Sequence, residues 1–264
     1  MVFMKTLVMK FGGAALETPE HFGNVADIIG EKEGRIVVVV SAMGDVTDEL
    51  TALAYQVAKN PAKREMDMLL SVGERVSMAL LAMALEERKI PAISLTGSQS
   101  GIITCNHHND AFIEDVRPIR VEKHLDEGKV VIIGGFQGVS HEKEITTLGR
   151  GGSDTSAVAL AAALGAENVE FYKDVEGIYT KDPKKDPQAT LLSELSFEEA
   201  LTFPEFVLHK RAILLASKNG MPLHVKSFKK EHRMCFPGTW IHGDAVEKRP
   251  VYEGYIETST KCRA

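Results

Sequence analysis

The sequence predicts an α/β fold in which a mainly parallel sheet lies between layers of helices. Strand-like and helical segments alternate along the chain, beginning with strand, helix, strand and helix. The run RIVVVV at 35–40 is continuously apolar and β-branched, as a strand covered on both faces must be. The 264 residues, 44% of them apolar, suffice to bury the core of one such body.

The N-terminal half of the chain accounts for three strands and three helices of this pattern. Strands are expected at 5–11, 35–41 and 92–95. Helices are expected at 19–31, 45–59 and 63–88, the last as one long helix. An irregular stretch with hairpin character is expected at 96–116.

The second half resumes the pattern after a short helix expected at 118–126. Further strands are expected at 129–135, 168–174 and 222–228, and further helices near 196–201 and 210–218. Near Thr146 lies a seam between an N-terminal lobe of about 1–145 and a C-terminal lobe of about 146–264. No Pro/Gly/Ser linker marks this seam, so the two lobes are expected to form one continuous body.

Composition excludes several classes of partner. The chain carries 37 acidic and 31 basic side chains, a net charge of −6, and no long basic run, so a nucleic-acid partner is not expected. The N-terminal segment lacks the length of a membrane span and the features of a signal peptide. Cys105, Cys235 and Cys262 are odd in number and far apart, which favours free thiols and a cytoplasmic location.

Three glycine-bearing turns follow predicted strands: KFGG at 10–13, SAMGD at 41–45 and GGFQG at 134–138. Ligands of open α/β sheets bind at the carboxyl ends of the strands, so the three turns are expected to share one rim. Neither the dinucleotide-binding G-x-G-x-x-G motif nor a P-loop occurs.

The segment GRGGSD at 149–154 leads directly into an alanine-rich helical run. Such a helix N-terminus, free of bulky side chains, attracts phosphate or carboxylate through its unpaired N–H groups. Alternatively, Ser153 or Asp154 simply caps the helix. The residues alone leave both readings open.

Eight segments, in this order, resemble the catalytic part of the aspartate kinases in the amino acid kinase family. They span about 5–228 and read VMKFGG, VVVVSAMGDVTDEL, LLSVGERVS, LTGSQSGIIT, GGFQGV, TTLGRGGSDTSAVALAAALGA, YKDVEGIYTKDP, and VLH followed by PLHVKSF. The resemblance implies a three-layer αβα sandwich with about eight mainly parallel strands. It places the amino acid in the N-terminal lobe and ATP in the C-terminal lobe.

The implied reaction transfers the γ-phosphoryl group of MgATP to the side-chain carboxylate of L-aspartate, giving 4-phospho-L-aspartate. Two alternatives stay open: another enzyme of the family, similar to glutamate 5-kinase, and a non-catalytic sensor of nucleotide or amino acid. Charge neutralisation matters most in such a transfer, and an ionised carboxylate needs no general base.

The resemblance assigns roles to residues of this chain at matching positions. As catalytic residues it implies Lys10, which stabilises the transferring phosphoryl group, and Asp154, which holds that lysine. As substrate contacts it implies Arg150 for the α-carboxylate, Glu74 for the α-ammonium, and Ser41, Thr47 and Ser153. As ATP contacts it implies Lys10, Gly12, Gly13, Lys173, Asp174, Tyr179 and Lys184.

Several of these residues also have an ordinary structural explanation. Lys10 could be a solvated lysine at a strand end, and Glu74 with Arg75 an exposed pair on a helix. Ser41 and Thr47 could be turn and cap residues, and Tyr179 a packed aromatic.

No protein-bound metal is expected. His107 and His108 would point to opposite faces of a strand, and no third ligand has suitable spacing. The expected cation is Mg²⁺, which arrives with ATP and is held mainly by phosphate oxygens and water.

The sequence departs from the family motifs at several positions. Ala14 and Ala15 replace two hydroxyl residues of KFGGTS, and Phe206 stands where GAKVLHP has its lysine. Lys184 replaces a frequent arginine and cannot repeat a bidentate contact.

Only residues 229–264 follow Phe228, too few for the usual pair of ACT regulatory domains. No ACT domain is therefore expected, and a separate regulatory subunit stays open. The resemblance also implies a homodimer.

Overall fold

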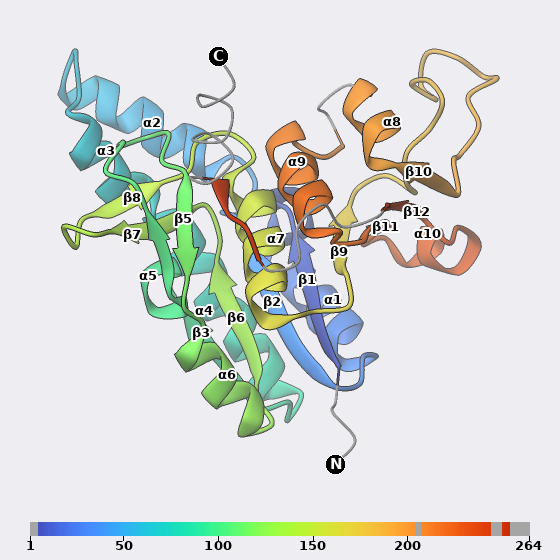
Figure 1. Ribbon diagram of the computed structural model, residues 1–264, viewed down its shortest axis with the longest axis horizontal. Helices are drawn as coiled ribbons and strands as arrows, with labels where there is room; N and C mark the ends of the chain where they lie inside the picture. Colours follow the sequence, from blue (N-terminus) through green and yellow to red (C-terminus); the bar gives the residue numbers. More distant parts are fainter. Residues whose placement is uncertain (1–4, 204–206, 244–249, 254–264) are drawn as a thin grey trace.

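The structure is a computed structural model that describes residues 5–203, 207–243 and 250–253. Its centre, within these residues, is an eight-stranded sheet in the order β10-β12-β11-β9-β1-β2-β6-β3 (Figure 1). Neighbouring strands are parallel except for the antiparallel pair β11 and β12. The strands are β1 (Thr6–Phe11), β2 (Arg35–Val40), β3 (Ala92–Leu95), β6 (Val130–Gly134), β9 (Val169–Lys173), β10 (Glu194–Ser196), β11 (Leu223–Ser227) and β12 (Thr239–His242). The predicted fold class is confirmed.

Helices cover both faces of this sheet because its central strands are apolar on both sides. In β2, Val37 and Val39 pack into one core, whereas Ile36, Val38 and Val40 pack into the other. The first core is closed by α6 (Ile119–Asp126), α7 (Gly152–Leu164), α8 (Phe197–Thr202) and α9 (Lys210–Asn219). The second is closed by α1 (Pro19–Gly30) and α4 (Val72–Glu87).

The alanine-rich run forms α7, whose residues from Gly152 to Ala162 are all buried. It packs against both the sheet and α9, which lies beside it in Figure 1. Strand β1 pairs with β2 on one side and with β9 on the other. One sheet therefore runs through both predicted lobes.

A smaller sheet, in the order β5-β4-β7-β8, lies next to α3 (Figure 1). Its strands are β4 (Ile102–Thr104), β5 (Ile113–Val116), β7 (Gln137–Ser140) and β8 (Ile145–Thr147). The remaining helices are a 3-10 turn (Gly13–Leu16), α2 (Val46–Val57), α3 (Lys63–Leu70), α5 (Gly97–Ser100) and α10 (Lys230–Cys235). The hairpin expected at 96–116 is confirmed as the antiparallel pair β4 and β5.

The single long helix expected at 63–88 is wrong. The hydroxyl of Ser71 donates to the carbonyl of Met68 at 3.1 Å, and the Ser71 carbonyl accepts from the Gln137 side chain at 2.9 Å. These bonds end α3 at Leu70 and let α4 begin at Val72. The combined stretch Lys63–Glu87 is long and apolar enough to cross a membrane by length and composition alone. Buried core helices of water-soluble proteins pass the same test, so this is weak evidence for a membrane span.

Candidate active site

A cavity of about 650 Å³ lies at the carboxyl ends of β1, β2 and β6. All three glycine-bearing turns contribute to its lining, which confirms that they share one rim. The loop 149–152 and the first turn of α7 form another wall. The cavity brings together eight of the predicted site residues: Lys10, Gly13, Ser41, Thr47, Glu74, Arg150, Ser153 and Asp154.

A buried cluster of two lysines and one aspartate lies at the floor of this cavity. The Lys10 ammonium is 2.7 Å from one carboxylate oxygen of Asp154, and the Lys173 ammonium is 3.2 Å from the other. Lys10 is only 4% exposed, so the alternative of a solvated strand-end lysine is wrong.

The charges in this cluster are set by competition between burial and pairing. Burial opposes ionisation of Asp154, but the ammonium groups of Lys10 and Lys173 outweigh burial and hold the pKa of its carboxyl well below the usual range. Burial lowers the pKa of Lys10, against the attraction of Asp154, and the neighbouring Lys173 lowers it further. The cluster as a whole carries an excess positive charge that suits a phosphate.

Helix α7 begins without a side-chain cap. Its N-cap is Gly151, with a φ of 74°, and no side chain accepts from the first turn. The alternative in which Ser153 or Asp154 caps the helix is therefore wrong for the described structure. The Asp154 carboxylate instead turns toward Lys10, and Gly152, Ser153 and Asp154 of the first turn all line the cavity.

The turns after β1 and β2 contact each other through backbone atoms. A Cβ on Gly13 would lie 2.9 Å from the Ala42 carbonyl oxygen and 3.1 Å from that of Gly44. The Gly44 amide donates to the Gly13 carbonyl at 3.2 Å. Gly13 is thus required for this close approach, which places Ser41 and Thr47 beside the lysine cluster.

Glu74 is a buried carboxylate that is only half satisfied. Its side chain accepts from the Ala42 amide at 3.1 Å through Oε1, while Oε2 is buried and has no hydrogen-bond partner in the described structure. Burial raises the pKa of Glu74 to about 7, against the Ala42 amide and the charge of Lys10. At 2% exposure it is not part of an exposed surface pair. A cation entering the cavity would complete its contacts.

Arg150 lies at the mouth of the same cavity on the loop before α7. Its side chain is exposed, and it makes no ion pair with any residue in the described ranges. A planar guanidinium in this position can bind a carboxylate through two hydrogen bonds.

The predicted nucleotide residues are more dispersed. Lys173 belongs to the buried cluster, but the Tyr179 hydroxyl donates to Glu176 at 3.4 Å and the Lys184 amide donates to Asp182 at 3.0 Å. Neither Tyr179 nor Lys184 lines the cavity at the rim. Phe206 and Cys262 lie outside the described residues.

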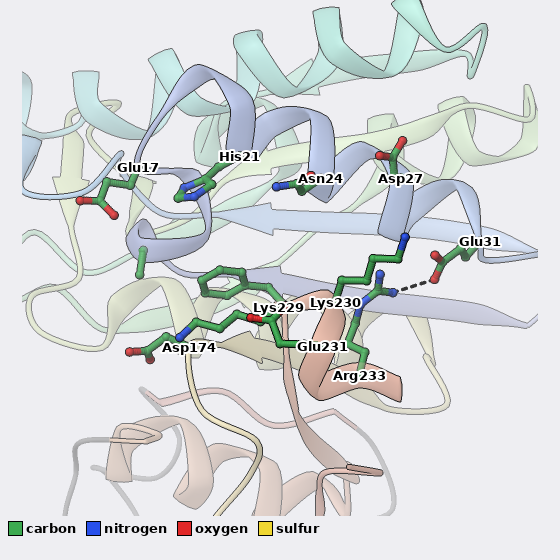
Figure 2. Close-up of a pocket in the computed structure, with 12 residues that line it drawn as sticks. Glu17, His21, Asn24, Asp27, Glu31, Asp174, Lys229, Lys230, Glu231 and Arg233 are labelled. Carbon is green, nitrogen blue, oxygen red and sulfur yellow. Dashed lines mark hydrogen bonds and ion pairs between the residues drawn. The ribbon is translucent and has the colours of Figure 1, made fainter. Parts of the chain in front are cut away.

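Asp174 lines a second cavity, of about 610 Å³, between α1 and α10 (Figure 2). One wall carries Glu17, Asp27 and Glu31, and the facing wall carries Lys229, Lys230 and Arg233. The Arg233 guanidinium bridges the two walls by pairing with Glu31 at 2.7 Å. Ala14 and Asp174 line this second cavity. Ala14 directly follows Gly13 of the first cavity, and Asp174 directly follows Lys173 of the lysine cluster, so the second cavity begins next to that cluster.

Asp67 on α3 is a site residue that sequence reasoning missed. It is fully buried and accepts from the Thr147 hydroxyl at 2.5 Å and the Asn109 amide at 3.0 Å, with His108 Nδ1 at 2.6 Å. Asn109 and Thr147 both line the cavity at the rim, so Asp67 fixes that wall. The sequence signal that could have pointed to Asp67 is a single acidic residue among the apolar residues of MDMLL.

His107 and His108 lie in the loop between β4 and β5 and not on a strand, so the opposite-face reasoning does not apply to them. His108 faces Asp67, and His107 Nδ1 is 3.6 Å from the sulfur of Cys105. Across the described ranges, no group of three or more His, Cys, Asp or Glu residues has the arrangement of a metal site.

The three-layer fold, with a cavity at the carboxyl ends of its parallel strands, defines a class of α/β protein, and sequence comparison identifies its family. A sequence model described as the amino acid kinase family matches residues 5–227. The chain belongs to the amino acid kinase family.

Aspartokinases from several bacteria are similar to this chain. That of Corynebacterium glutamicum is 49% identical over 260 residues, which cover 96% of this chain and 61% of the relative. That of Geobacillus stearothermophilus is 49% identical over 258 residues, which cover 95% and 62%. The chain thus spans about three fifths of the length of these relatives.

Solved structures agree with this assignment. Aspartate kinase from Synechocystis superposes with a TM-score of 0.81 at 47% identity, covering 92% of this chain and 40% of that one. E. coli aspartokinase III in complex with aspartate and ADP superposes with a TM-score of 0.79 at 27% identity, covering 92% and 66%. A UMP kinase from Bacillus anthracis, with a TM-score of 0.66 at 20% identity, covers 92% of this chain and 97% of that one and shares the fold.

Proposed function

We propose that this chain is the catalytic part of an ATP-dependent aspartate kinase. The observation that carries the proposal is the cavity itself. It places a half-satisfied buried carboxylate (Glu74) and an exposed guanidinium (Arg150) beside the cluster of Lys10, Asp154 and Lys173. An α-amino acid with a second carboxylate matches this set of charges, and the aspartokinase relatives support the choice of aspartate.

The substrate is held by its amino-acid groups. Arg150 binds the α-carboxylate, and Glu74 in its ionised form accepts from the α-ammonium through Oε2. The hydroxyls of Ser41, Thr47 and Ser153 donate to the carboxylates. The side-chain carboxylate of aspartate then points toward Lys10.

In the reaction, one oxygen of that carboxylate forms a bond to the γ-phosphorus of ATP. The bond from this phosphorus to the bridging oxygen breaks, and ADP leaves with the electron pair. No proton is transferred, because the nucleophile is already ionised. Lys10 stabilises charge on the transferring group, Asp154 holds Lys10 in place, and Lys173 adds a second ammonium.

ATP is proposed to bind through the turn at Gly12 and Gly13, through Lys173 and Asp174, and through Tyr179 and Lys184. Both carboxylate oxygens of Asp154 already face ammonium groups, and the described residues offer no cluster of three metal ligands. Mg²⁺ would therefore be held mainly by the phosphate oxygens of the nucleotide and by water.

A homodimer is proposed through α4. Its side chains Val72, Val76, Leu80 and Met83 recur at three- to four-residue spacing on one helix face, and all four are exposed. We propose a cytoplasmic location and no nucleic-acid or membrane partner. A separate regulatory subunit remains an open alternative.

A coupled assay of ADP release with hydroxamate trapping tests the proposal. Candidate acceptors are aspartate, glutamate, N-acetylglutamate, UMP and carbamate, each at saturating MgATP. Aspartyl hydroxamate formed from aspartate alone is the expected result. Turnover of glutamate or UMP without aspartate would instead identify another kinase of the family. Calorimetric binding of aspartate and an ATP analogue without any acyl phosphate would identify a sensor, as the departures at Ala14 and Ala15 would suggest.

A further inference from the structure

The C-terminal segment 250–253 reaches back to the body through Glu253. This carboxylate is buried, and its Oε2 accepts from the Ile113 amide at 2.9 Å. It also pairs with the guanidinium of Arg211 on α9: Nε of Arg211 donates to Oε1, and Nη2 donates to Oε2 at 3.1 Å. The segment thus joins α9 to strand β5.

The same guanidinium holds two backbone carbonyls of other segments. Nη2 of Arg211 donates to the Ala111 carbonyl at 2.5 Å, and Nη1 donates to the Leu148 carbonyl. Nη1 also lies 3.4 Å from the Asp110 carboxylate. Arg211 therefore fixes α9 against the residues before the loop 149–152, in an orientation set by Glu253.

That loop carries Arg150. Its start is fixed by the Leu148 carbonyl, two residues earlier, and its end by Gly151, where a Cβ would lie 2.2 Å from the ring of His209 at the N-cap of α9. Arg150 itself makes no ion pair with the described residues, so the backbone of this loop decides where its guanidinium stands. The first turn of α9 thus holds both ends of the loop.

We propose that Glu253 is a positioning residue for substrate binding: by orienting Arg211 it keeps Arg150 where it meets the α-carboxylate of the substrate. The proposal rests on the proposed function for its substrate. It makes the C-terminal segment, which lies beyond the residues matched by the family model, a part of the substrate site.

Glu253→Gln and Arg211→Lys test this role in the whole chain. Glutamine keeps the volume of Glu253 and removes its charge, while a lysine at 211 has a single compact ammonium that cannot repeat the planar fork by which Arg211 contacts both carboxylate oxygens of Glu253 and two carbonyls. We expect KM for aspartate to rise about tenfold in each variant, equivalent to the loss of one charge-assisted hydrogen bond. KM for ATP should stay within about twofold, because this loop is not assigned to the nucleotide.

A double-mutant cycle separates positioning from general damage. In an Arg150→Ala background, Glu253→Gln should raise KM for aspartate no further, since both changes act on the same contact. Glu127→Gln is the matched control, because Glu127 forms an exposed ion pair with Lys129 on the surface after α6. It should leave both KM values unchanged.

Amide hydrogen exchange on the unliganded protein gives a readout that does not need aspartate turnover. Exchange in the peptide 146–152 should become faster in Glu253→Gln than in Glu127→Gln, with the core strands unchanged. If the wild type does not phosphorylate aspartate, the proposed function is wrong. The exchange measurement still tests whether Glu253 fixes the loop 149–152. Equal rises in both KM values, additive effects with Arg150→Ala, or unchanged exchange at 146–152 would each overturn the proposal. If Glu253→Gln does not fold, Arg211→Lys carries the same measurements.

Discussion

Glu74→Gln is the most informative perturbation of the site, because Glu74 has one buried oxygen without a partner and a pKa near neutrality. The proposed substrate offers an ammonium group to that oxygen, and only the ionised carboxylate attracts it strongly. With a pKa of about 7, Glu74 is about nine-tenths ionised at pH 8 and about one-tenth ionised at pH 6. We therefore expect kcat/KM for aspartate to fall about tenfold between pH 8 and pH 6.

The variant should lose both the activity and its pH dependence. Replacing one partner of a buried charge pair costs roughly 2–5 kcal/mol, so kcat/KM for aspartate should fall by about two orders of magnitude at pH 8. The remaining activity should be flat between pH 6 and pH 8, while KM for ATP changes little. Initial-rate kinetics in a buffer of constant ionic strength measures all three quantities, with Glu127→Gln as the control. A wild-type profile without the slope, or a variant that keeps it, would show that Glu74 does not receive the ammonium.

The same substitution should stabilise the unliganded protein at high pH. The folded pKa of about 7 lies above the ordinary 4.5, so the folded state binds more protons than the unfolded state between these values. The free energy of unfolding should therefore decrease by about 3 kcal/mol as the pH rises from 4.5 to 7. Glutamine removes this decrease, so Tm of Glu74→Gln should exceed that of the wild type by about 5–10 °C at pH 8. The difference should vanish below pH 4.5, and a lower Tm at pH 8 would contradict the role of burial.

Three further perturbations address the lysine cluster, the cavity wall and α4. Lys10→Ala should lower kcat by two or more orders of magnitude, roughly 3 kcal/mol, with circular dichroism unchanged; a near-normal kcat would remove Lys10 from the mechanism. Asp67→Asn should raise KM for aspartate about tenfold and KM for ATP little, because it weakens the bonds that fix Asn109 and Thr147; an unchanged KM would mean that this wall does not touch the substrate. Met83→Glu should shift the mass measured by light scattering from dimer to monomer at micromolar concentration, and a dimer that persists would place the interface elsewhere.

The central sheet could be predicted from local sequence because burial on both faces leaves its mark residue by residue. The run RIVVVV contributes to both cores, and each expected strand of the central sheet is present. The short strands β7, β8, β10 and β12 were not expected. Each has only three or four residues, too short a run to show a clear alternation of apolar and polar side chains. In addition, β10 pairs with β12, which is distant in the sequence, whereas β7 and β8 form a local antiparallel pair. The break at Ser71 likewise depends on Gln137, which no local periodicity reveals.

In the candidate site, the sequence motifs pointed to residues that line the cavity. They did not point to the buried residues that contact this lining from outside the cavity. Lys10, Glu74 and Asp154 belong to segments that resemble family motifs, and the fold brings all three to one cavity. Asp67 contacts Thr147, which is 80 residues away in the chain, and Glu253 contacts Arg211, which is 42 residues away. These contacts exist only in the folded chain, so local sequence does not reveal them. The positions of Tyr179 and Lys184 away from the rim leave their nucleotide contacts as predictions.

Two buried carboxylates of similar exposure illustrate how the site distinguishes its ligands. Asp154 faces two ammonium groups and has a pKa below the usual range, whereas Glu74 faces one amide at hydrogen-bond distance and has a pKa of about 7. Burial is nearly the same for both, so the difference arises from the number of cations nearby. Asp154 is therefore already paired with two ammonium groups of the protein, as its proposed role of holding Lys10 requires. In the described structure, no side-chain cation lies within hydrogen-bond distance of Glu74. The substrate ammonium is the group that would provide this cation.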